Sequence, residues 1–400
     1  MKTIRLFDQN SHLYTFASPI AAITDGPTPK TVGVITEATA FFPEEGGQYA
    51  DTGTLGGFPV EDVREQGGVI THILPAAARE ALAVGQTVTG EVNAAVRFPR
   101  MQNHTGEHII SGIVHRRFGY KNVGFHLGDR GETPDVTLDF DGVLTREQLN
   151  EIEEEANAIV TACLPVKAYY PTPDVLATLS YRAKLELTEG VRIVQIGRDG
   201  DEKDLCACCA PHVDNTGEIG LIKLLDFIHY KGGVRIHMLC GPWALRDYRN
   251  RYTAVASMAA AMSVKQEEVL TGFARREAEI EDKKRTIAAL RGKLEGLTVA
   301  AITPTEGSLC LFDEGLEALE MRRLLTRAAE RCGRFCGVFS GNDDTGYRFV
   351  IGRGNPDLDL KKYAKTINEA LCARGGGSSE MLQGSSAAKR ADIEAFFEKI

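Results

Sequence analysis

Two short segments rich in histidine and cysteine, far apart in the sequence, constrain this chain more than any other feature. The first, HTGEH, places His104 and His108 four residues apart, and on a helix such residues share one face. The second, residues 206–212 (CACCAPH), supplies three cysteines and His212. Because Zn²⁺ accepts thiolates and imidazoles together, a fold that joins the two segments would hold one metal ion.

Spacing alone leaves the thiol ligand open, since Cys206, Cys208 and Cys209 are all near enough. Three thiolates with one histidine would form a closed, structural site. One thiolate with three histidines could keep a water in an open or expandable position, which hydrolysis needs. The alternative without a metal is a buried cluster of reduced thiols beside an incidental pair of histidines.

Length and composition set the broad class. The 400 residues predict about two to four domains. Hydrophobic residues make up 43% and charged residues 25%, so a sizeable core can form and wholesale disorder is excluded. No apolar run is long enough to span a bilayer, and the N-terminus lacks the apolar stretch of a signal peptide, so we expect a cytoplasmic protein. Nine cysteines, an odd number, argue against a fully paired disulfide framework.

The formal net charge is −9. This excludes a protein that relies on bulk positive charge to hold nucleic acid. Local basic patches would still allow an RNA partner, so any argument for RNA rests on motifs.

The expected fold class is α+β with several domains. Residues 1–96 alternate short strands with Gly- and Pro-rich turns, which favours a small β-barrel or sandwich closed by a strand over 85–96. Residues 97–250 mix helices and strands, and residues 299–400 alternate strand and helix as in a small α/β domain. Between 97 and 250 we expect helices over 104–118 and 146–163 and strands over 191–197 and 220–230.

Residues 251–298 contain few glycines and no proline, which predicts a long helix or a helical hairpin. Phe273, Ile280, Ile287 and Leu294 recur every seven residues. The companion row is interrupted by charged residues such as Arg276, so we expect a partial coiled-coil seam rather than a full zipper. The charged run EIEDKKR is interpreted as a solvated face.

Several separated segments resemble the editing domain of alanyl-tRNA synthetase and its free-standing relatives, the AlaX proteins. HTGEH followed by residues 208–220 (CCAPHVDNTGEIG) is similar to the two metal segments of that family. Residues 42–53 (FPEEGGQYADTG) are similar to its Gly-rich loop, and residues 231–236 (KGGVRI) to the strand after the second metal segment. Residues 375–384 (GGGSSEMLQG) resemble the end of its DHH-associated domain. The motifs follow the family's order along essentially the whole chain.

The resemblance implies a zinc-dependent hydrolase that clears tRNA for alanine wrongly charged with serine or glycine. It implies an N-terminal β-barrel domain (1–96), a zinc-binding editing domain (97–250), a helical arm (251–298) and a C-terminal DHH-associated domain (299–400). None of the class II aminoacylation signatures is found upstream of the expected barrel, so we expect a free-standing editor of the long type. The arm and the last domain are expected to grip the tRNA and to form a homodimer. The implied zinc ligands are His104, His108, Cys208 and His212.

This chain departs from the family's pattern at three places. The usual Cys-Gly-Gly-Thr-His is Cys208-Cys209-Ala210-Pro211-His212, which puts an additional thiol beside the site. Glu45 replaces the first of three glycines in the loop, and the C-terminal glycine run is shorter. These changes bear on substrate recognition more than on the metal site.

Other residues receive roles by resemblance or position. Gln48, in the Gly-rich loop, is expected to contact substrate, the alternative being an ordinary turn residue. Glu107 could act as a base, although a solvated or outer-sphere role is favoured because it points partly away from its neighbouring histidines. Thr105 either packs within the helix or lines the pocket. A glycine run near the C-terminus could let the RNA backbone approach, or could form a plain turn between helices; it consists of Gly375, Gly376 and Gly377.

Two other functions remain open. One is a non-catalytic tRNA-binding protein whose extra cysteines close a structural zinc site. The other is a metallohydrolase that acts on a small ester or amide. The sequence does not decide between serine and glycine as the preferred misacylated amino acid, nor which tRNA features are recognised, nor the oligomeric state.

Overall fold

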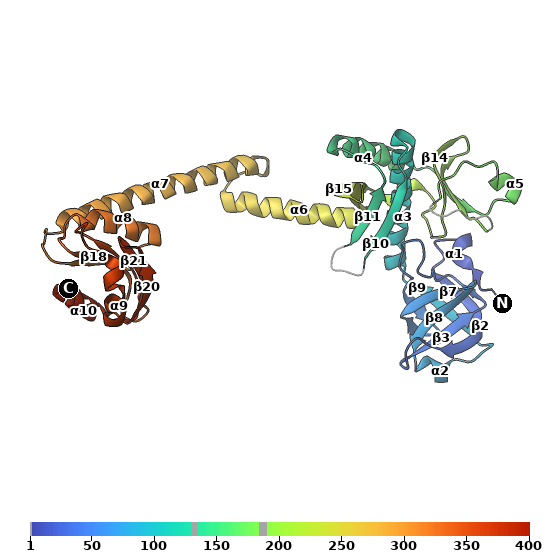
Figure 1. Cartoon of the computed structure of the whole chain (residues 1–400). Coiled ribbons are helices and arrows are strands. Elements are labelled where there is room, and N and C mark those ends of the chain that lie inside the picture. The colour runs from blue at the N-terminus through green and yellow to red at the C-terminus, as the bar shows by residue number, and fades with distance from the viewer. Residues whose placement is uncertain (1, 130–133, 184–189) are drawn as a thin grey trace. The chain divides into compact units, whose positions relative to one another are not determined.

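The computed structural model describes residues 2–129, 134–183 and 190–400. The chain is a mixed α/β protein in which several sheets are joined and covered by helices (Figure 1). Its contacts divide it into two compact units, Met1–Ser257 and Met258–Ile400. Each unit has hydrophobic cores of its own.

The N-terminal part of the first unit is a barrel-like sheet, in agreement with the expected β-rich start. Its strand order is β6-β5-β9-β2-β3-β8-β7 with antiparallel neighbours, and β6 also contacts β8, so the sheet is nearly closed. Alternate residues of β9 are buried, as a strand with one face toward a core requires. The strands are β2 (Thr15–Asp25), β3 (Thr31–Thr36), β5 (Gly53–Leu55), β6 (Phe58–Val60), β7 (Asp62–Gln66), β8 (Val69–Pro75) and β9 (Thr87–Val92).

Helix α3 (Ala94–Phe118) follows the barrel and carries the HTGEH segment. It begins ten residues before the predicted start at His104, so residue 96, the expected end of the first domain, lies in its first turn. The prediction missed this part because Pro99 normally signals the end of a helix and because the buried polar residues here break the apolar periodicity. The helix ends at Phe118, as predicted, and is followed by Gly119, whose φ of 73° is left-handed.

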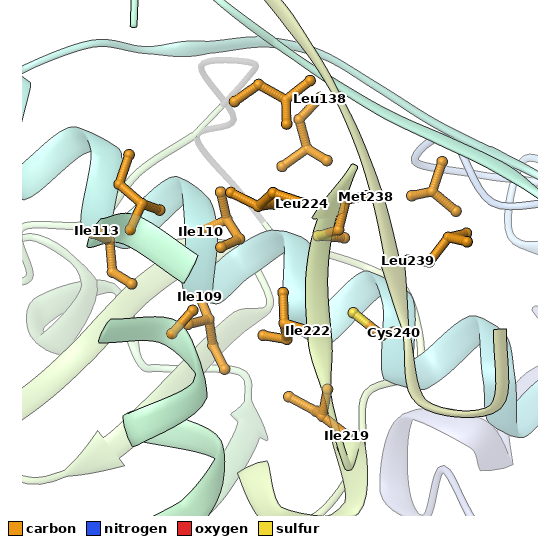
Figure 2. Close-up of a cluster of buried hydrophobic side chains, with 14 of the residues drawn as sticks. Ile109, Ile110, Ile113, Leu138, Ile219, Ile222, Leu224, Met238, Leu239 and Cys240 are labelled. Carbon is orange, nitrogen blue, oxygen red and sulfur yellow. The ribbon is translucent and has the colours of Figure 1, made fainter. Parts of the chain in front are cut away.

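The apolar face of α3 packs on a four-stranded antiparallel sheet of order β10-β11-β16-β15 (Figure 2). Helix α4 (Arg146–Thr161), which matches its prediction closely, starts with a capping box between Thr145 and Gln148. The strands are β10 (Asn122–Gly128), β11 (Asp135–Phe140), β15 (Ile222–Tyr230) and β16 (Gly233–Cys240). In the core, Ile109, Ile110 and Ile113 of α3 meet Leu138, Leu224 and Met238 of the sheet.

A three-stranded antiparallel sheet of order β12-β13-β14 lies against α3. Its strands are β12 (Val166–Tyr169), β13 (Ile193–Arg198) and β14 (Asp201–Ala207). β14 ends one residue before Cys208, so this sheet delivers the cysteine segment to the helix that carries the two histidines.

Helix α6 (Gly241–Met262) crosses the division between the units, and α7 (Val269–Ala301) is one continuous helix of 33 residues. Phe273, Ile280, Ile287 and Leu294, the row spaced by sevens, are 51–59% exposed on α7. The long helix agrees with the predicted arm, although the helical region runs beyond both predicted ends, 251 and 298.

The second unit ends in a five-stranded sheet of order β17-β18-β19-β21-β20, with one parallel pair, β17 with β18. Gly375, Gly376 and Gly377 lie in the edge strand β20, paired with β21, so the alternative of a plain turn between helices is wrong. The elements are β17 (Leu309–Phe312), α8 (Ala318–Ala329), β18 (Phe335–Asn342), β19 (Gly346–Arg353), α9 (Leu360–Ala370), β20 (Ala373–Gly377), β21 (Met381–Ser386) and α10 (Arg390–Lys399).

Among the residues described, no helix is both long enough and apolar enough to cross a membrane.

Candidate metal centre

Two elements bring the predicted ligands together. α3 presents His104 and His108 one turn apart on one face, and the segment after β14 presents Cys208 and His212. Gly106, between the two histidines, lets α3 approach β16, because a Cβ there would come within 2.4 Å of the Cys240 sulfur. The helix is therefore packed on one face while its other face receives the cysteine segment.

The four side chains form one compact cluster. One ligand atom from each of His104, His108, Cys208 and His212 lies within 4.8 Å of all the others. Cys208 Sγ is 3.4 Å from His212 Nε2 and 3.6 Å from His104 Nε2. All three histidines are at most 3% exposed. Three imidazoles and one thiol that converge in a buried space form a donor set suited to Zn²⁺.

The nitrogen of each histidine that faces away from the cluster has a polar neighbour. His104 Nδ1 lies 3.1 Å from Gln48 Oε1, and His212 Nδ1 lies 3.0 Å from Thr105 Oγ1. His108 Nδ1 lies 3.2 Å from a carboxylate oxygen of Asp204. Such neighbours fix the tautomer and the ring orientation of a metal-binding histidine, which leaves each Nε2 for the ion.

Asp204 is itself held in place. It is 5% exposed, and Arg182 donates two hydrogen bonds of 2.7 Å to its two carboxylate oxygens. Burial acts to raise the pKa of Asp204, but Arg182 and His108 outweigh it and lower the pKa. The carboxylate therefore stays charged where it faces His108.

Gln48 reaches the cluster because its loop docks on β10. Gly46 and Gly47 have φ of 63° and 83°, and a Cβ at Gly47 would lie 2.6 Å from the carbonyl oxygen of Phe125. The backbone N–H of Leu127 donates to Gly47 O at 3.0 Å. Gln48 is fully buried, and its Nε2 has no hydrogen-bond partner among the described residues. This amide is therefore a spare donor next to the metal cluster.

Arg192, which is 6% exposed, fixes the position of the cysteine segment by hydrogen bonds. Its Nη1 donates to the carbonyl oxygens of Cys208 and Ala210, and its own carbonyl accepts from Cys208 N. Sequence reasoning did not find this residue, because nothing in the pattern VRIVQIG marks one arginine as buried.

Charges within the cluster favour a metal ligand at Cys208. Burial acts to raise the pKa of Cys208, but the charge of His104 and hydrogen bonds with His104 and His108 outweigh it and hold the pKa well below its usual value. Burial lowers the pKa of His212 to about 3, so its ring is neutral. Burial also acts to lower the pKa of His108, yet the carboxylates of Glu107 and Asp204 raise it well above its usual value. A metal would displace that proton on binding.

The two other thiols of the segment have different surroundings. Cys206 groups with His108 and Asp204 rather than with the four-residue cluster, and burial raises its pKa to about 11. Cys209 has its sulfur against Gly46, and burial raises its pKa as well. Neither sulfur belongs to the four-residue cluster, so this geometry does not support the alternative in which three thiolates close the site.

Glu107 and Thr105 have definite contacts. Glu107 is 2% exposed, accepts hydrogen bonds from Ser111 and Asn122, and lies 3.6 Å from His108 Nε2. Of the expected solvated or outer-sphere role, the solvated one is therefore wrong, because the polar start of β10 closes over α3, and the contact with His108 is compatible with the outer-sphere one. Thr105 is fully buried, so it holds His212 rather than lining a pocket. The glycine run at 375–377 belongs to the second unit.

The fold and the cluster together define a mixed α/β protein with a candidate His₃Cys metal centre. Two family models match parts of this chain. A model for the threonyl and alanyl tRNA synthetase second additional domain matches residues 191–238, which include Cys208 and His212. A model for tRNA synthetases class II (A) matches residues 14–96, which include Gln48.

The similar curated proteins are alanine–tRNA ligases. An alanine–tRNA ligase from Pyrobaculum neutrophilum is 29% identical over 100% of this chain and 44% of its own length. The alanine–tRNA ligase of Pyrobaculum calidifontis is 30% identical over 96% of this chain and 42% of its own length. The alanine–tRNA ligase of Chromohalobacter salexigens is 29% identical over 88% of this chain and 42% of its own length. The chain thus spans less than half the length of these relatives. It carries alanyl-tRNA synthetase-family domains and is homologous to alanine–tRNA ligases.

Proposed function

We propose that this protein is an aminoacyl-tRNA hydrolase of the AlaX type, which removes serine or glycine from wrongly charged tRNA for alanine. It would act in trans in the cytoplasm, with Zn²⁺ held by His104, His108, Cys208 and His212. The observation that carries the proposal is the buried convergence of three imidazoles and one thiol whose histidines are each oriented from outside. Homology to alanine–tRNA ligases supports tRNA as the substrate class.

The donor set is compatible with a catalytic zinc if the ion expands its coordination beyond the four protein ligands. Protein ligands beyond the four are not needed, and one thiolate with three neutral imidazoles is compatible with an additional substrate or water ligand. When bound, Zn²⁺ would supply Lewis-acid chemistry toward the ester that joins the amino acid to the terminal ribose. A closed site with several thiolates, as the structural-zinc alternative requires, is disfavoured because neither Cys206 nor Cys209 belongs to the four-residue cluster.

The protein's own groups would bind and orient the substrate. Gln48 accepts from His104 through Oε1 and keeps its buried Nε2 to donate to the aminoacyl group. Glu107, held by Ser111 and Asn122, would keep negative charge beside His108 and could accept a proton. A site that hydrogen-bonds the serine hydroxyl loses that partner with alanine, which costs about 1–3 kcal/mol and spares correctly charged tRNA. Glycine has no hydroxyl, so it would have to be distinguished from alanine by a pocket too small for the alanine methyl group.

The second unit would serve tRNA binding and assembly. β20, with Gly375, Gly376 and Gly377, is an edge strand without side chains at three positions, which would let an RNA backbone come close. The half-exposed row on α7 would pair with a second copy of the chain. Sedimentation of the intact protein tests the dimer.

The test is a deacylation assay with tRNA for alanine charged with serine, glycine or alanine, with and without a chelator. We expect the seryl ester to be cleaved, the alanyl ester to be spared, and the chelator or Cys208→Ala to stop the reaction. Cys209→Ala, the adjacent control, should keep it. Tight tRNA binding without turnover would instead support a structural-zinc module, and equal cleavage of esters lacking the tRNA would support a small-molecule hydrolase.

A further inference from the structure

The metal centre is accessible from the side of its thiol. Its three histidines are at most 3% exposed, whereas Cys208 and the adjacent Cys209 are only partly buried. The turn that ends at Gln48 borders this side, because a Cβ at the exposed Gly46 would lie 3.5 Å from Cys209 Sγ. A substrate that reaches the centre from the thiol side therefore passes this turn.

Glu45 places a carboxylate on the same turn. Its backbone exchanges two hydrogen bonds with Gln48, at 3.1 and 3.2 Å, so the two residues lie at opposite ends of one tight turn. Gln48 faces His104, and Glu45 accepts a hydrogen bond from the Cys209 thiol. Glu45 and Cys209 both stand where the resembling family usually has glycine. The carboxylate and the thiol that contacts it are therefore features of this chain itself.

The Glu45 carboxylate is held in place and still has room for another donor. Arg5 Nη2 donates to one of its oxygens at 3.4 Å, and the side chain is 46% exposed. An ionised carboxylate has about four acceptor positions, so Arg5 and the Cys209 thiol do not saturate it.

The charges around Glu45 favour a cation. Arg5 lies 3.3, 3.4 and 3.6 Å from Asp8, Glu45 and Glu65, and Arg192 lies 3.5 Å from Asp8. Carboxylates are ordinarily ionised at neutral pH. Three carboxylates therefore share two guanidiniums, which leaves this group with an excess of negative charge beside the metal centre.

An aminoacyl ester carries a cation close to its reacting carbon. The α-ammonium group is bonded to the carbon next to the ester carbonyl, so only two bonds separate its nitrogen from the carbon that is attacked. Cys209, which contacts Glu45, directly follows the ligand Cys208, and consecutive Cα atoms are about 3.8 Å apart. Carboxylate and metal centre are thus spaced on the scale of one amino acid. A hydrogen bond from an ammonium to a carboxylate is charge-assisted and roughly twice as strong as a neutral one.

We infer that Glu45 binds the α-ammonium group of the aminoacyl ester, so that the protein prefers esters with a free amino group to N-acylated ones such as peptidyl-tRNA. The inference deepens the proposed function and rests on it. The two ends of one turn would divide the substrate between them. Gln48 would donate to its oxygens, and Glu45 would accept from its nitrogen.

The test compares seryl-tRNA for alanine with its N-acetylated form, using the full-length protein. We expect kcat/KM of the wild type to be about tenfold higher for the free amine, because the N-acetylated form lacks one charge-assisted hydrogen bond. Glu45→Gln keeps the shape of the side chain without its charge. It should raise KM for the seryl ester about tenfold and leave the N-acetylated ester and the zinc content unchanged. Glu45→Gly, which restores the usual glycine, should behave in the same way.

The matched control is Glu61→Gln, an equal change at an exposed position of the barrel, which should alter neither ester. A role of Glu45 in holding the turn alone would lower kcat/KM for both esters equally, and that result would overturn the inference. Equal kcat/KM for the two esters in the wild type, or a preference that survives in Glu45→Gln, would also refute it.

Hydrolysis and recognition of the amino group are separate readouts. If the wild type cleaves neither ester, the proposed function fails. The affinity for an uncleavable RNA that carries serine through a 3′-amide, with and without N-acetylation, then decides the inference by the same comparison of wild type and Glu45→Gln. If both esters are cleaved equally well, only this inference fails.

Discussion

Arg97 on α3 and Asp51 in the loop after Gln48 form an ion pair in the interior of the first unit. Their side chains are 0% and 1% exposed, and Arg97 Nε lies 3.0 and 2.9 Å from the two Asp51 oxygens. Asp51 also accepts from Phe42 N at 2.7 Å, and Arg97 Nη1 donates to Ser11 O. The pair thus joins the barrel and the Gly-rich loop to the helix that carries His104 and His108.

Removing one partner of this pair should be costly. Asp51→Asn leaves a buried guanidinium without its counter-ion, so we expect the free energy of unfolding to fall by about 3–5 kcal/mol. Asp62→Asn, which breaks the exposed pair with Arg64, should change it by less than about 1 kcal/mol. Denaturant titration of both variants measures the difference. Equal stability of the two variants would show that the pair does not anchor the loop.

Asp204 should control metal affinity without being a ligand. In Asp204→Asn the charged partner of His108 and Arg182 is lost, so we expect zinc affinity to fall about 10–100-fold. Asp199→Asn, on the same β-hairpin but 83% exposed, should have no effect. Competition with a zinc chelator measures both affinities. An unchanged affinity in Asp204→Asn would contradict the orienting role.

Gln48 should show two separable roles. Gln48→Glu keeps an oxygen to accept from His104 but loses the Nε2 donor, whereas Gln48→Ala loses both. We expect Gln48→Glu to retain zinc and lose kcat/KM on seryl-tRNA by roughly 10–100-fold, which corresponds to about 1.4–2.7 kcal/mol of transition-state binding. Gln48→Ala should in addition bind zinc more weakly. Wild-type activity in Gln48→Glu would remove the proposed donor to substrate.

The barrel should lose stability in mild acid through His72. This fully buried side chain lies between Thr39 Oγ1 at 2.8 Å and Val34 O at 2.9 Å, and burial lowers its pKa to about 4. As the pH falls, His72 is protonated in the unfolded chain before it is protonated in the folded one. Its contribution to the free energy of unfolding is therefore complete above about pH 6.5 and is lost toward pH 4. Between pH 7 and pH 5 it amounts to about 2 kcal/mol. Urea unfolding should show this decrement in the wild type and not in His72→Gln; the same decrement in both would exclude His72 as its source.

Much of the candidate site could be predicted because its ligands carry their own chemistry. His104 and His108 are spaced by one helical turn, and Cys208 and His212 combine residue types that Zn²⁺ prefers. The structure brings these four together as expected. Strand positions such as β13 and β15 were also predictable, since their apolar runs are short and lie between turn residues.

The residues that support the site could not be predicted, because they are polar or charged residues that are buried only through contacts with distant segments. Arg97, Asp204 and Arg192 look like surface residues in the sequence, and each becomes buried through a contact from a segment far along the chain. The early start of α3 was missed for the same reason. Hydrophobic periodicity carries no information on such pairs.

X-ray absorption at the zinc edge of the purified full-length protein tests the central claim most directly. We expect one zinc per chain with one sulfur at about 2.3 Å and three nitrogens at about 2.0–2.1 Å. The sulfur contribution should vanish in Cys208→Ala and persist in Cys206→Ala and Cys209→Ala. Two or more sulfur ligands, or a chain without stoichiometric metal, would contradict a three-histidine, one-cysteine centre and the hydrolytic function built on it.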